Sequence, residues 1–198
     1  MAKETLAIDI DEVLYPFLDE FIVHHNAEYN TQLTREDFDS YNFEGPLCLE
    51  IPEMVKRVYA FTGMTADIQV DPLKEARESI VKLSDKYDLV VVTARHPSFE
   101  DITINWLERH FPDYFKHVEL IGHPALVDKP LTKAEVCLRL GATALIDDSL
   151  LHTTQVAEIG IKGILFGNYK WNQMDVLPER VVRCENWSAV LKHLLIES

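Results

Sequence analysis

Five short apolar runs recur along the chain, each bounded by polar or turn-forming residues. Continuous apolar runs of four to eight residues are typical of strands that are buried on both faces of a parallel sheet. The predicted strands span residues 5–10, 88–93, 117–121, 142–147 and 161–166.

Helical patterns lie between these runs. Residues 73, 76, 80, 83 and 87 are apolar and fall on one face of a predicted helix, because their spacing is three or four. Thr132 and Glu135 have the spacing of a capping box, and Gly141 stands where that helix is expected to end. Further helices are predicted at 98–110, 150–160 and 186–196. Strands that alternate with helices favour an α/β fold, a Rossmann-like parallel sheet with helices on both faces.

Residues 15–70 interrupt this alternation. Residues 17–29 and 51–61 have helical patterns, with Gly63 as the expected end of the second helix, and Gly45-Pro46 marks a turn between them. We interpret the chain as an α/β core formed by residues 1–14 and 71–198, with a small helical cap at 15–70. The cap is expected to lie over the strand ends like a lid.

Composition narrows the function classes. The chain has 198 residues, 47% of them apolar, and no apolar run approaches the ~18 residues of a membrane span. The net charge of −14 opposes an extended nucleic-acid surface, although one nucleotide in a pocket remains possible. Three well-separated cysteines form no metal-binding pair, and the short acidic N-terminal stretch does not resemble a signal peptide. We expect a cytoplasmic protein with no membrane contact.

Three of the predicted strands end in residues with useful chemistry, namely Asp9, Thr93 and Asp147. Ligands of such folds bind beyond the carboxyl ends of the strands. Two carboxylate pairs lie there, Asp9 with Asp11 and Asp147 with Asp148, and such pairs favour Mg²⁺ because a cation relieves their repulsion. The alternative is that these acids begin solvated loops or cap helices.

Candidate anion-binding residues accompany the acids. The hydroxyl of Thr93 and the backbone N–H groups of Ala94 and Arg95 can hold phosphate oxygens, and the Arg95 side chain can add a bidentate contact. Lys133 lies in the first turn of a predicted helix, where a cation is unfavourable unless an anion is near. Alternatively, Thr93 caps a helix, and Arg95 and Lys133 lie on the surface. The polar aromatic segment 167–172 follows a predicted strand, so it either borders the site or forms a surface loop, and we favour the surface loop.

These residues occur in the order of the haloacid dehalogenase (HAD) superfamily motifs. The matching segments are Asp9-Ile10-Asp11-Glu12-Val13-Leu14, Val91-Val92-Thr93, Lys133 and Leu145-Ile146-Asp147-Asp148. Within that superfamily the chain most resembles the 5′(3′)-deoxyribonucleotidase family. The resemblance covers the core, and the helical segment falls where that superfamily inserts a cap.

The resemblance implies a Mg²⁺-dependent phosphomonoester hydrolase that forms an aspartyl-phosphate. Asp9 would be the nucleophile, and Asp11 the acid and then the base. Thr93 and Lys133 would bind the phosphoryl group. The carboxylate of Asp9, the backbone carbonyl of Asp11, and the region of Asp147 and Asp148 would hold Mg²⁺.

The resemblance leaves the substrate open. The leading hypothesis is a (deoxy)nucleoside monophosphate. The alternatives are another small phosphometabolite, a polynucleotide 3′-phosphate, or a non-catalytic HAD-like binding protein. Glu12 departs from the family, since the related nucleotidases usually have glycine there, and its carboxylate would either repel a bulky anionic substrate or bind a sugar hydroxyl. The aromatic residues Tyr15, Phe17 and Phe43 either stack on a base or form the core of the cap.

Overall fold

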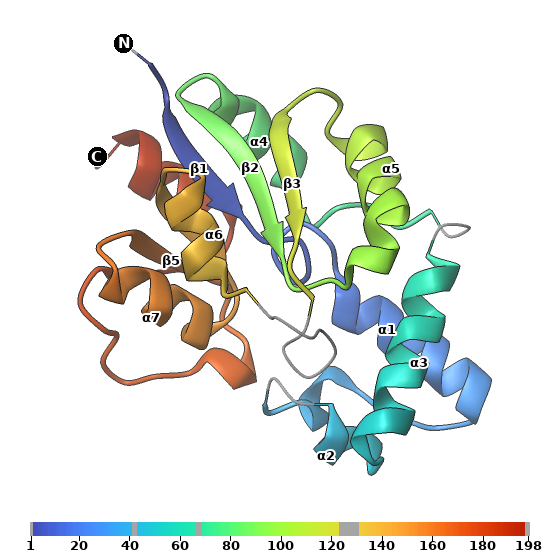
Figure 1. Ribbon diagram of the computed structural model, residues 1–198. Helices are drawn as coiled ribbons and strands as arrows, with labels where there is room; N and C mark the ends of the chain where they lie inside the picture. Colours follow the sequence, from blue (N-terminus) through green and yellow to red (C-terminus); the bar gives the residue numbers. More distant parts are fainter. Residues whose placement is uncertain (1, 41–42, 66–68, 123–130, 197–198) are drawn as a thin grey trace.

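The computed structural model describes residues 2–40, 43–65, 69–122 and 131–196 (Figure 1). Its centre is a parallel sheet in which the strand order is β3-β2-β1-β4-β5-β6. The strands are β1 (Glu4–Ile8), β2 (Tyr87–Thr93), β3 (Phe115–Leu120), β4 (Ala142–Asp147), β5 (Lys162–Phe166) and β6 (Val181–Cys184). The Rossmann-like α/β prediction is therefore confirmed.

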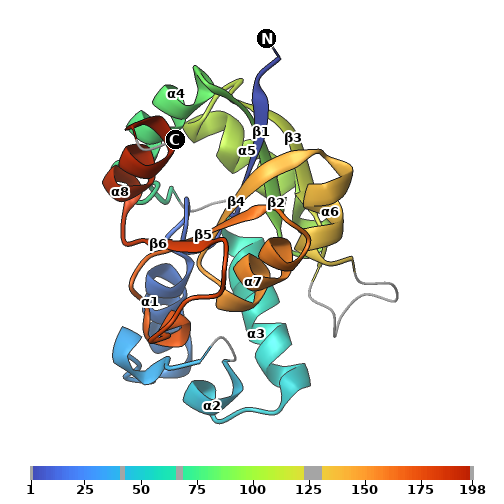
Figure 2. The ribbon, with the colours of Figure 1, turned by 90° about the vertical axis from the view of Figure 1, so that its left-hand side faces the viewer.

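Helices cover both faces of the sheet, and the alternation of strand side chains explains why. Leu6 and Ile8 of β1 pack into one cluster, with α4 (Ala76–Ser84), α5 (Glu100–His110) and α8 (Trp187–Leu191). Ala7 points to the opposite face and packs with α6 (Lys133–Arg139) and α7 (Leu150–Glu158). Figure 2 shows α4 and α8 on one side of the strands and α6 on the other. Both faces of β1 are thus buried, as its unbroken apolar run predicts.

A helical insertion separates β1 from α4. It contains α1 (Phe17–Tyr29), a 3₁₀ turn (Arg35–Asp37), α2 (Glu44–Leu47) and α3 (Ile51–Met64). Both views place α1, α2 and α3 beyond the carboxyl ends of β1 and β2 (Figures 1 and 2). The insertion has its own apolar core, which includes Phe21, Phe38 and Phe61.

The candidate base-stacking aromatics belong to these cores. Phe17 and Phe43 pack around Phe21, with ring centroids 6.0 and 5.4 Å from it. Tyr15 is 1% exposed and lies edge-on to Trp106 at 5.1 Å. Of the two interpretations that the sequence left open, the structure favours core packing over base stacking.

One predicted helix end needs correction, and one strand was not predicted. The helix predicted to end at Gly63 continues to Met64 and is terminated by Thr65. The backbone N–H of Thr65 bonds to the carbonyls of Phe61 and Thr62, and its hydroxyl donates to Thr62 O at 2.7 Å. A threonine therefore ends this helix, and Gly63 lies inside it. The strand β6 was not predicted, because a four-residue edge strand carries too little pattern.

Within the described part of the chain, every helix is too short or too polar to span a bilayer.

Candidate active site at the strand ends

The candidate site lies where the strand order reverses. From β1, the chain extends the sheet first through β2 and β3 and later, on the other side, through β4, β5 and β6. Such a switch point leaves a crevice beyond the carboxyl ends of the two central strands. Asp9 follows β1 directly and Asp147 ends β4, while Asp9 N donates to Ile146 O at 2.9 Å. Local topology therefore brings together two acids that are 138 positions apart in sequence.

Lys133 lies between these acids. It is the first residue of α6, its side chain is fully buried, and its Nζ lies 2.8 Å from Asp9 Oδ2 and 2.7 Å from Asp147 Oδ2. Burial lowers the pKa of Lys133, but the carboxylates of Asp147 and Asp9 outweigh that effect and raise it above its usual value. The side chain therefore stays cationic, and the predicted surface alternative for Lys133 does not hold.

The three buried acids have different electrostatic states. Burial raises the pKa of Asp9 to about 6, opposed by Lys133. Burial also disfavours the charge on Asp147, but Lys133 and His152 more than compensate and lower its pKa. Burial and the neighbouring Asp147 raise the pKa of Asp148 well above its usual value. Asp147 is thus a firmly charged partner, whereas Asp9 and Asp148 carry charge that the protein alone does not stabilise.

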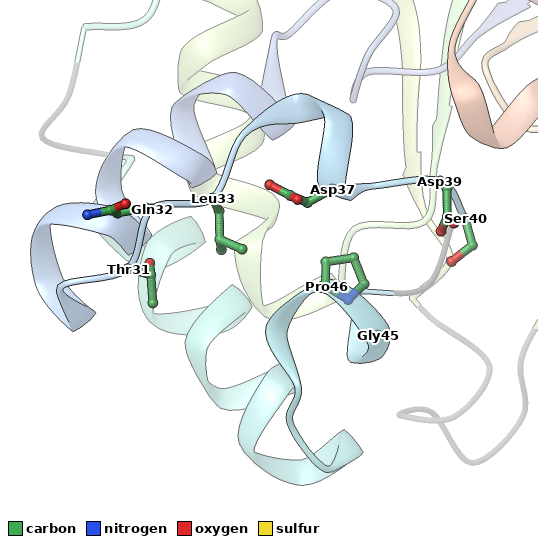
Figure 3. A pocket seen from close by; sticks show the side chains of 8 residues that line it. All are labelled: Thr31, Gln32, Leu33, Asp37, Asp39, Ser40, Gly45 and Pro46. Carbon is green, nitrogen blue, oxygen red and sulfur yellow. The ribbon is translucent and has the colours of Figure 1, made fainter.

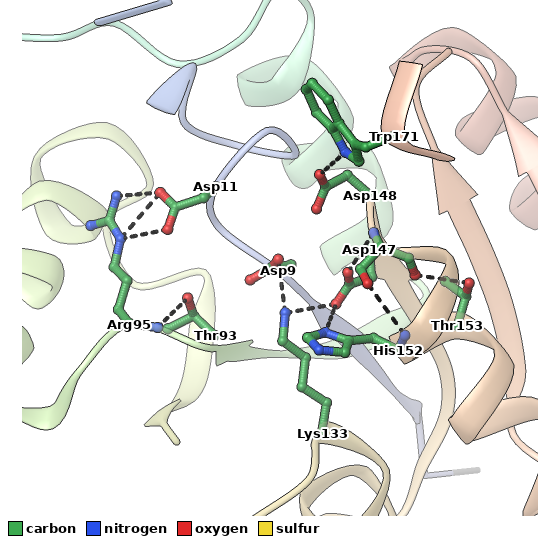
Figure 4. Close-up of polar contacts among 11 residues, drawn as sticks. Asp9, Asp11, Thr93, Arg95, Lys133, Asp147, Asp148, His152, Thr153 and Trp171 are labelled. Atoms are coloured by element: carbon green, nitrogen blue, oxygen red, sulfur yellow. Dashed lines mark hydrogen bonds and ion pairs between the residues drawn. The ribbon is translucent and has the colours of Figure 1, made fainter. Parts of the chain in front are cut away.

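The hydrogen bonds agree with this division (Figure 4). Both oxygens of Asp147 are engaged, since Oδ1 accepts from Ser149 N at 2.9 Å and Oδ2 lies 2.7 Å from Lys133 Nζ and 3.4 Å from His152 Nδ1. In contrast, Oδ1 of Asp9 and Oδ1 of Asp148 are buried without a hydrogen-bond partner among the described residues. Unpaired buried carboxylate oxygens are costly, so a proton or a bound cation would stabilise them at this point.

The donor set fits a hard divalent cation. Ligand oxygens of Asp9, Asp147 and Asp148 lie within 4.8 Å of one another. All three donors are carboxylates, which are the ligands that Mg²⁺ prefers. Of the four predicted metal ligands, only the Asp11 side chain lies outside this group, and the expected role of the Asp11 backbone carbonyl stays a prediction.

Asp11 is held instead by Arg95. The Arg95 side chain is 5% exposed, with Nη2 2.6 Å from Asp11 Oδ1 and Nε 3.1 Å from Asp11 Oδ2. Arg95 also lies over the Tyr15 ring, and Nη1 donates to Thr103 Oγ1 at 3.4 Å. The buried Thr93 accepts a 3.3 Å hydrogen bond from Arg95 N. Arg95 is therefore not a surface residue, and its guanidinium contacts a carboxylate of the candidate site.

The segment predicted as a surface loop borders the site. It contains a 3₁₀ turn, Lys170–Asn172, in which Trp171 Nε1 donates to Asp148 Oδ2 at 2.8 Å and Asn172 Nδ2 donates to Asp148 O at 3.0 Å. The available signal in the sequence was the position of this polar aromatic segment directly after a predicted strand. His152, near Asp147, was missed, because it is one residue among many on a helix.

Glu12 connects the end of β1 to the insertion. Its Oε1 accepts from Leu18 N at 2.7 Å near the start of α1, and its Oε2 lies 2.9 Å from Arg35 Nη2. Burial raises the pKa of Glu12, opposed by Arg35. The carboxylate is thus committed to the protein, which argues against a direct contact with a sugar hydroxyl.

A separate pocket lies within the insertion (Figure 3). It has a volume of about 680 Å³, and no residue of the Asp9 cluster lines it. Its lining residues are Thr31, Gln32, Leu33, Asp37, Asp39, Ser40, Gly45 and Pro46. Two carboxylates in this wall make it a poor match for a phosphate group.

Solved structures of HAD-like proteins share this fold. The chain superposes on YfnB from Bacillus subtilis, in a crystal structure bound to magnesium, with a TM-score of 0.70 and 13% identity, covering 99% of this chain and 100% of that one. For the haloacid dehalogenase-like family protein SP0104 from Streptococcus pneumoniae, the TM-score is 0.69 and the identity 15%, over 96% of this chain and 98% of that one. At these identities the likeness shows the fold, which is HAD-like.

Sequence comparison identifies the family within that fold. The 5′(3′)-deoxyribonucleotidase of Bacillus subtilis is 24% identical over 200 residues, covering 98% of this chain and 99% of that protein. The model of the family described as 5′ nucleotidase, deoxy (pyrimidine), cytosolic type C protein matches residues 3–197. Because this match extends over almost the whole chain, the protein belongs to that 5′ nucleotidase family.

Proposed function

We propose that the protein is a Mg²⁺-dependent phosphomonoesterase that works through an aspartyl-phosphate on Asp9. One observation carries this proposal. Asp9 is 2% exposed, one of its oxygens is held by Lys133 at 2.8 Å, and the other has no partner among the described residues. A carboxylate that is oriented on one side and unpaired on the other is suited to nucleophilic attack once its charge is balanced.

The proposed reaction has two balanced steps. An Asp9 oxygen forms a bond to phosphorus while the ester P–O bond breaks, and the departing alkoxide takes a proton from Asp11. Water then attacks the phosphorus of the aspartyl-phosphate and gives a proton to Asp11, which releases inorganic phosphate and restores both carboxyl groups. In this structure the Arg95 guanidinium donates to both oxygens of Asp11, so Asp11 would have to leave this contact before it carries the proton of the first step.

The neighbouring residues stabilise the charge that moves in these steps. Lys133 Nζ is buried beside Asp9 and would neutralise a phosphoryl oxygen. The Thr93 hydroxyl and the backbone N–H of Ala94 would hold the others, whereas the N–H of Arg95 already donates to Thr93 Oγ1 at 3.3 Å. The free oxygen of Asp148, Asp147 and the Asp9 carboxylate oxygen that does not attack phosphorus would hold Mg²⁺, with the Asp11 carbonyl as a further ligand. When bound, Mg²⁺ supplies positive charge to the phosphate oxygens.

We further propose that the substrate is a (deoxy)nucleoside monophosphate and that residues 15–70 act as a cap over the site. Family membership supports the substrate class. The position of α1, α2 and α3 beyond the strand ends supports the cap (Figure 1). A cap that excludes bulk water during the first step would protect the aspartyl-phosphate from early hydrolysis.

The test is phosphate release from a panel of nucleoside monophosphates and sugar phosphates, with Mg²⁺ and with EDTA. We expect Mg²⁺-dependent release that is highest for deoxynucleotides and is lost in Asp9→Asn. Asp85→Asn, at the exposed C-terminal end of α4, is a matched control that should retain activity. Release that favours another ester would keep the mechanism and reject the substrate class. Equal activity of the wild type and Asp9→Asn would reject the mechanism.

A further inference from the structure

The turn Lys170–Asn172 holds Asp148 at two points. Trp171 Nε1 donates to the side-chain Oδ2 at 2.8 Å, and Asn172 Nδ2 donates to the backbone oxygen at 3.0 Å. Asn172 is itself fully buried, and its amide also donates to Phe166 O at the end of β5. The turn therefore fixes the position of the Asp148 backbone and gives its carboxylate a directional partner.

The indole of Trp171 is itself held in place. It stacks on the Tyr169 ring with centroids 4.6 Å apart and planes 10° apart, and the Arg35 guanidinium lies 5.9 Å from its centroid. Tyr169 is anchored in turn, because its hydroxyl donates to Glu12 O at 2.8 Å. An indole N–H is only a donor, so a ring that cannot turn dictates which carboxylate oxygen faces it.

The hydrogen bond from Trp171 makes the two carboxylate oxygens of Asp148 inequivalent. Oδ2 is occupied by Trp171, while Oδ1 has no hydrogen-bond partner among the described residues. Figure 4 shows Trp171 on the side of Asp148 that faces away from Asp9 and Asp147. Oδ1 is thus available for the cluster of three carboxylates formed by Asp9, Asp147 and Asp148.

We propose that Trp171 is a positioning residue that keeps one oxygen of Asp148 directed at the Mg²⁺ site. This inference rests on the proposed function, because it requires that Asp9, Asp147 and Asp148 hold the cation. Hydrogen bonds that orient ligating carboxylates contribute to metal affinity as well as to geometry. Without the indole N–H, the Asp148 carboxylate is free to rotate. Binding of Mg²⁺ then has to fix its orientation, and the entropic cost of doing so lowers the affinity.

The experiment measures Mg²⁺ affinity of the substrate-free protein by calorimetry. Trp171→Phe removes the N–H and keeps an aromatic ring for the stack on Tyr169. We expect a loss in Mg²⁺ affinity of about 10-fold. In turnover assays, the Mg²⁺ concentration for half-maximal rate should rise while kcat at saturating Mg²⁺ stays near that of the wild type. A purely structural defect would not produce this split.

Lys170→Met is the matched control in the same turn. Lys170 pairs with Glu36 of the insertion at the surface, at 2.7 Å. This variant should bind Mg²⁺ as the wild type does. Equal affinities of Trp171→Phe and the wild type would overturn the proposal, and so would an equal loss in Lys170→Met.

A measurement on the wild type covers the case in which Trp171→Phe does not fold. The chain has three tryptophans, and the indoles of Trp106 and Trp187 donate to the backbone oxygens of Val70 and Val13. In an indole ¹⁵N spectrum, Mg²⁺ should shift the Trp171 signal most. A titration that leaves all three signals unchanged would overturn the proposal.

Failure of the proposed function gives a different result. Mg²⁺ binding that weakens in Trp171→Phe, with no phosphate released from any ester by the wild type, would support the role of Trp171 and contradict the phosphatase proposal. A wild type that binds no Mg²⁺ would contradict both.

Discussion

Glu12 adopts a backbone conformation that usually favours glycine. Its φ is 59°, which lies in the left-handed region that glycine adopts without a steric cost. A left-handed conformation costs a non-glycine residue about 1–2 kcal/mol. Two contacts offset that cost, namely the 2.7 Å bond from Leu18 N and the 2.9 Å ion pair with Arg35. The Glu12 carboxylate therefore binds the end of β1 to the insertion through Leu18 N and Arg35.

We predict that Glu12→Gly destabilises the protein although it relieves backbone strain. Two hydrogen bonds to a buried charged group contribute about 1.5–3 kcal/mol each, which exceeds the strain. The free energy of unfolding, from urea titration, should fall by about 2 kcal/mol. Asp113→Gly is the matched control, since Asp113 is exposed with φ 62° and should gain stability from the same substitution. A Glu12→Gly variant more stable than the wild type would show that the contacts do not outweigh the strain.

The sequence was sufficient to predict those site residues that end a predicted strand or begin a predicted helix. Asp9, Asp147 and Lys133 belong to this class. In the structure, Lys133 Nζ lies within 2.8 Å of a carboxylate oxygen of each acid. The sequence was insufficient for contacts between loops. Arg95 meets Asp11 across 84 positions of the chain, and Trp171 meets Asp148 across 23. Neither pair has a local pattern, because both depend on how the strands are ordered in the sheet.

At the scale of elements, the start of α6 sets the position of Lys133. Thr132 Oγ1 accepts from Glu135 N at 3.1 Å, and Glu135 Oε2 accepts from Thr132 N at 2.8 Å, which forms the capping box that the sequence predicted. Lys133 is the first helical residue, so its backbone is fixed by this cap. The cap thus offsets the unfavourable interaction of a cation with this end of the helix.

We predict that Thr132→Ala lowers the free energy of unfolding by about 1 kcal/mol. It should also lower the turnover rate, because a frayed first turn no longer holds Lys133 beside Asp9. Thr34→Ala is the control, since Thr34 makes the same type of contact with Asp37 in an exposed turn of the insertion. It should leave turnover unchanged. If Thr132→Ala lost stability and kept full turnover, the cap would not set the position of Lys133.

Some element boundaries followed the sequence closely, and others did not. The predicted strand 142–147 is observed as β4 with the same bounds, and the predicted helix 17–29 is observed as α1. The strand at 5–10 ends earlier, at Ile8, because the carbonyl of Ile10 accepts from the backbone N–H groups of Val13, Leu14 and Tyr15 in a tight turn. That turn depends on tertiary packing and has no glycine or proline to signal it.

At the scale of the whole molecule, the net charge of −14 must be reconciled with an anionic substrate. Four carboxylates of the candidate site, those of Asp9, Asp11, Asp147 and Asp148, meet two cationic side chains, Lys133 and Arg95. A divalent cation would balance the remaining charge, so a phosphate would meet a locally neutral site on an acidic protein. The predicted absence of an extended nucleic-acid surface and the predicted cytoplasmic location stay predictions.

Division of the chain into a core and a cap is also a proposal at this scale. The insertion has a separate apolar core, yet Glu12, Arg35 and Lys170 connect it to the loops that border the site. Any movement of the insertion would either break these contacts or move Glu12 and Lys170 together with it.

Detection of the phosphoryl group on Asp9 tests the central proposal most directly. Asp11→Asn, given p-nitrophenyl phosphate and Mg²⁺, should form the aspartyl-phosphate, because this leaving group departs without a proton donor. Hydrolysis should be slow, because the base that activates water is lost. After an acid quench, peptide mass spectrometry should find one phosphoryl group on Asp9, and none in Asp9→Asn. Release of nitrophenol with no phosphorylated peptide, or with phosphate on another residue, would contradict the proposed mechanism.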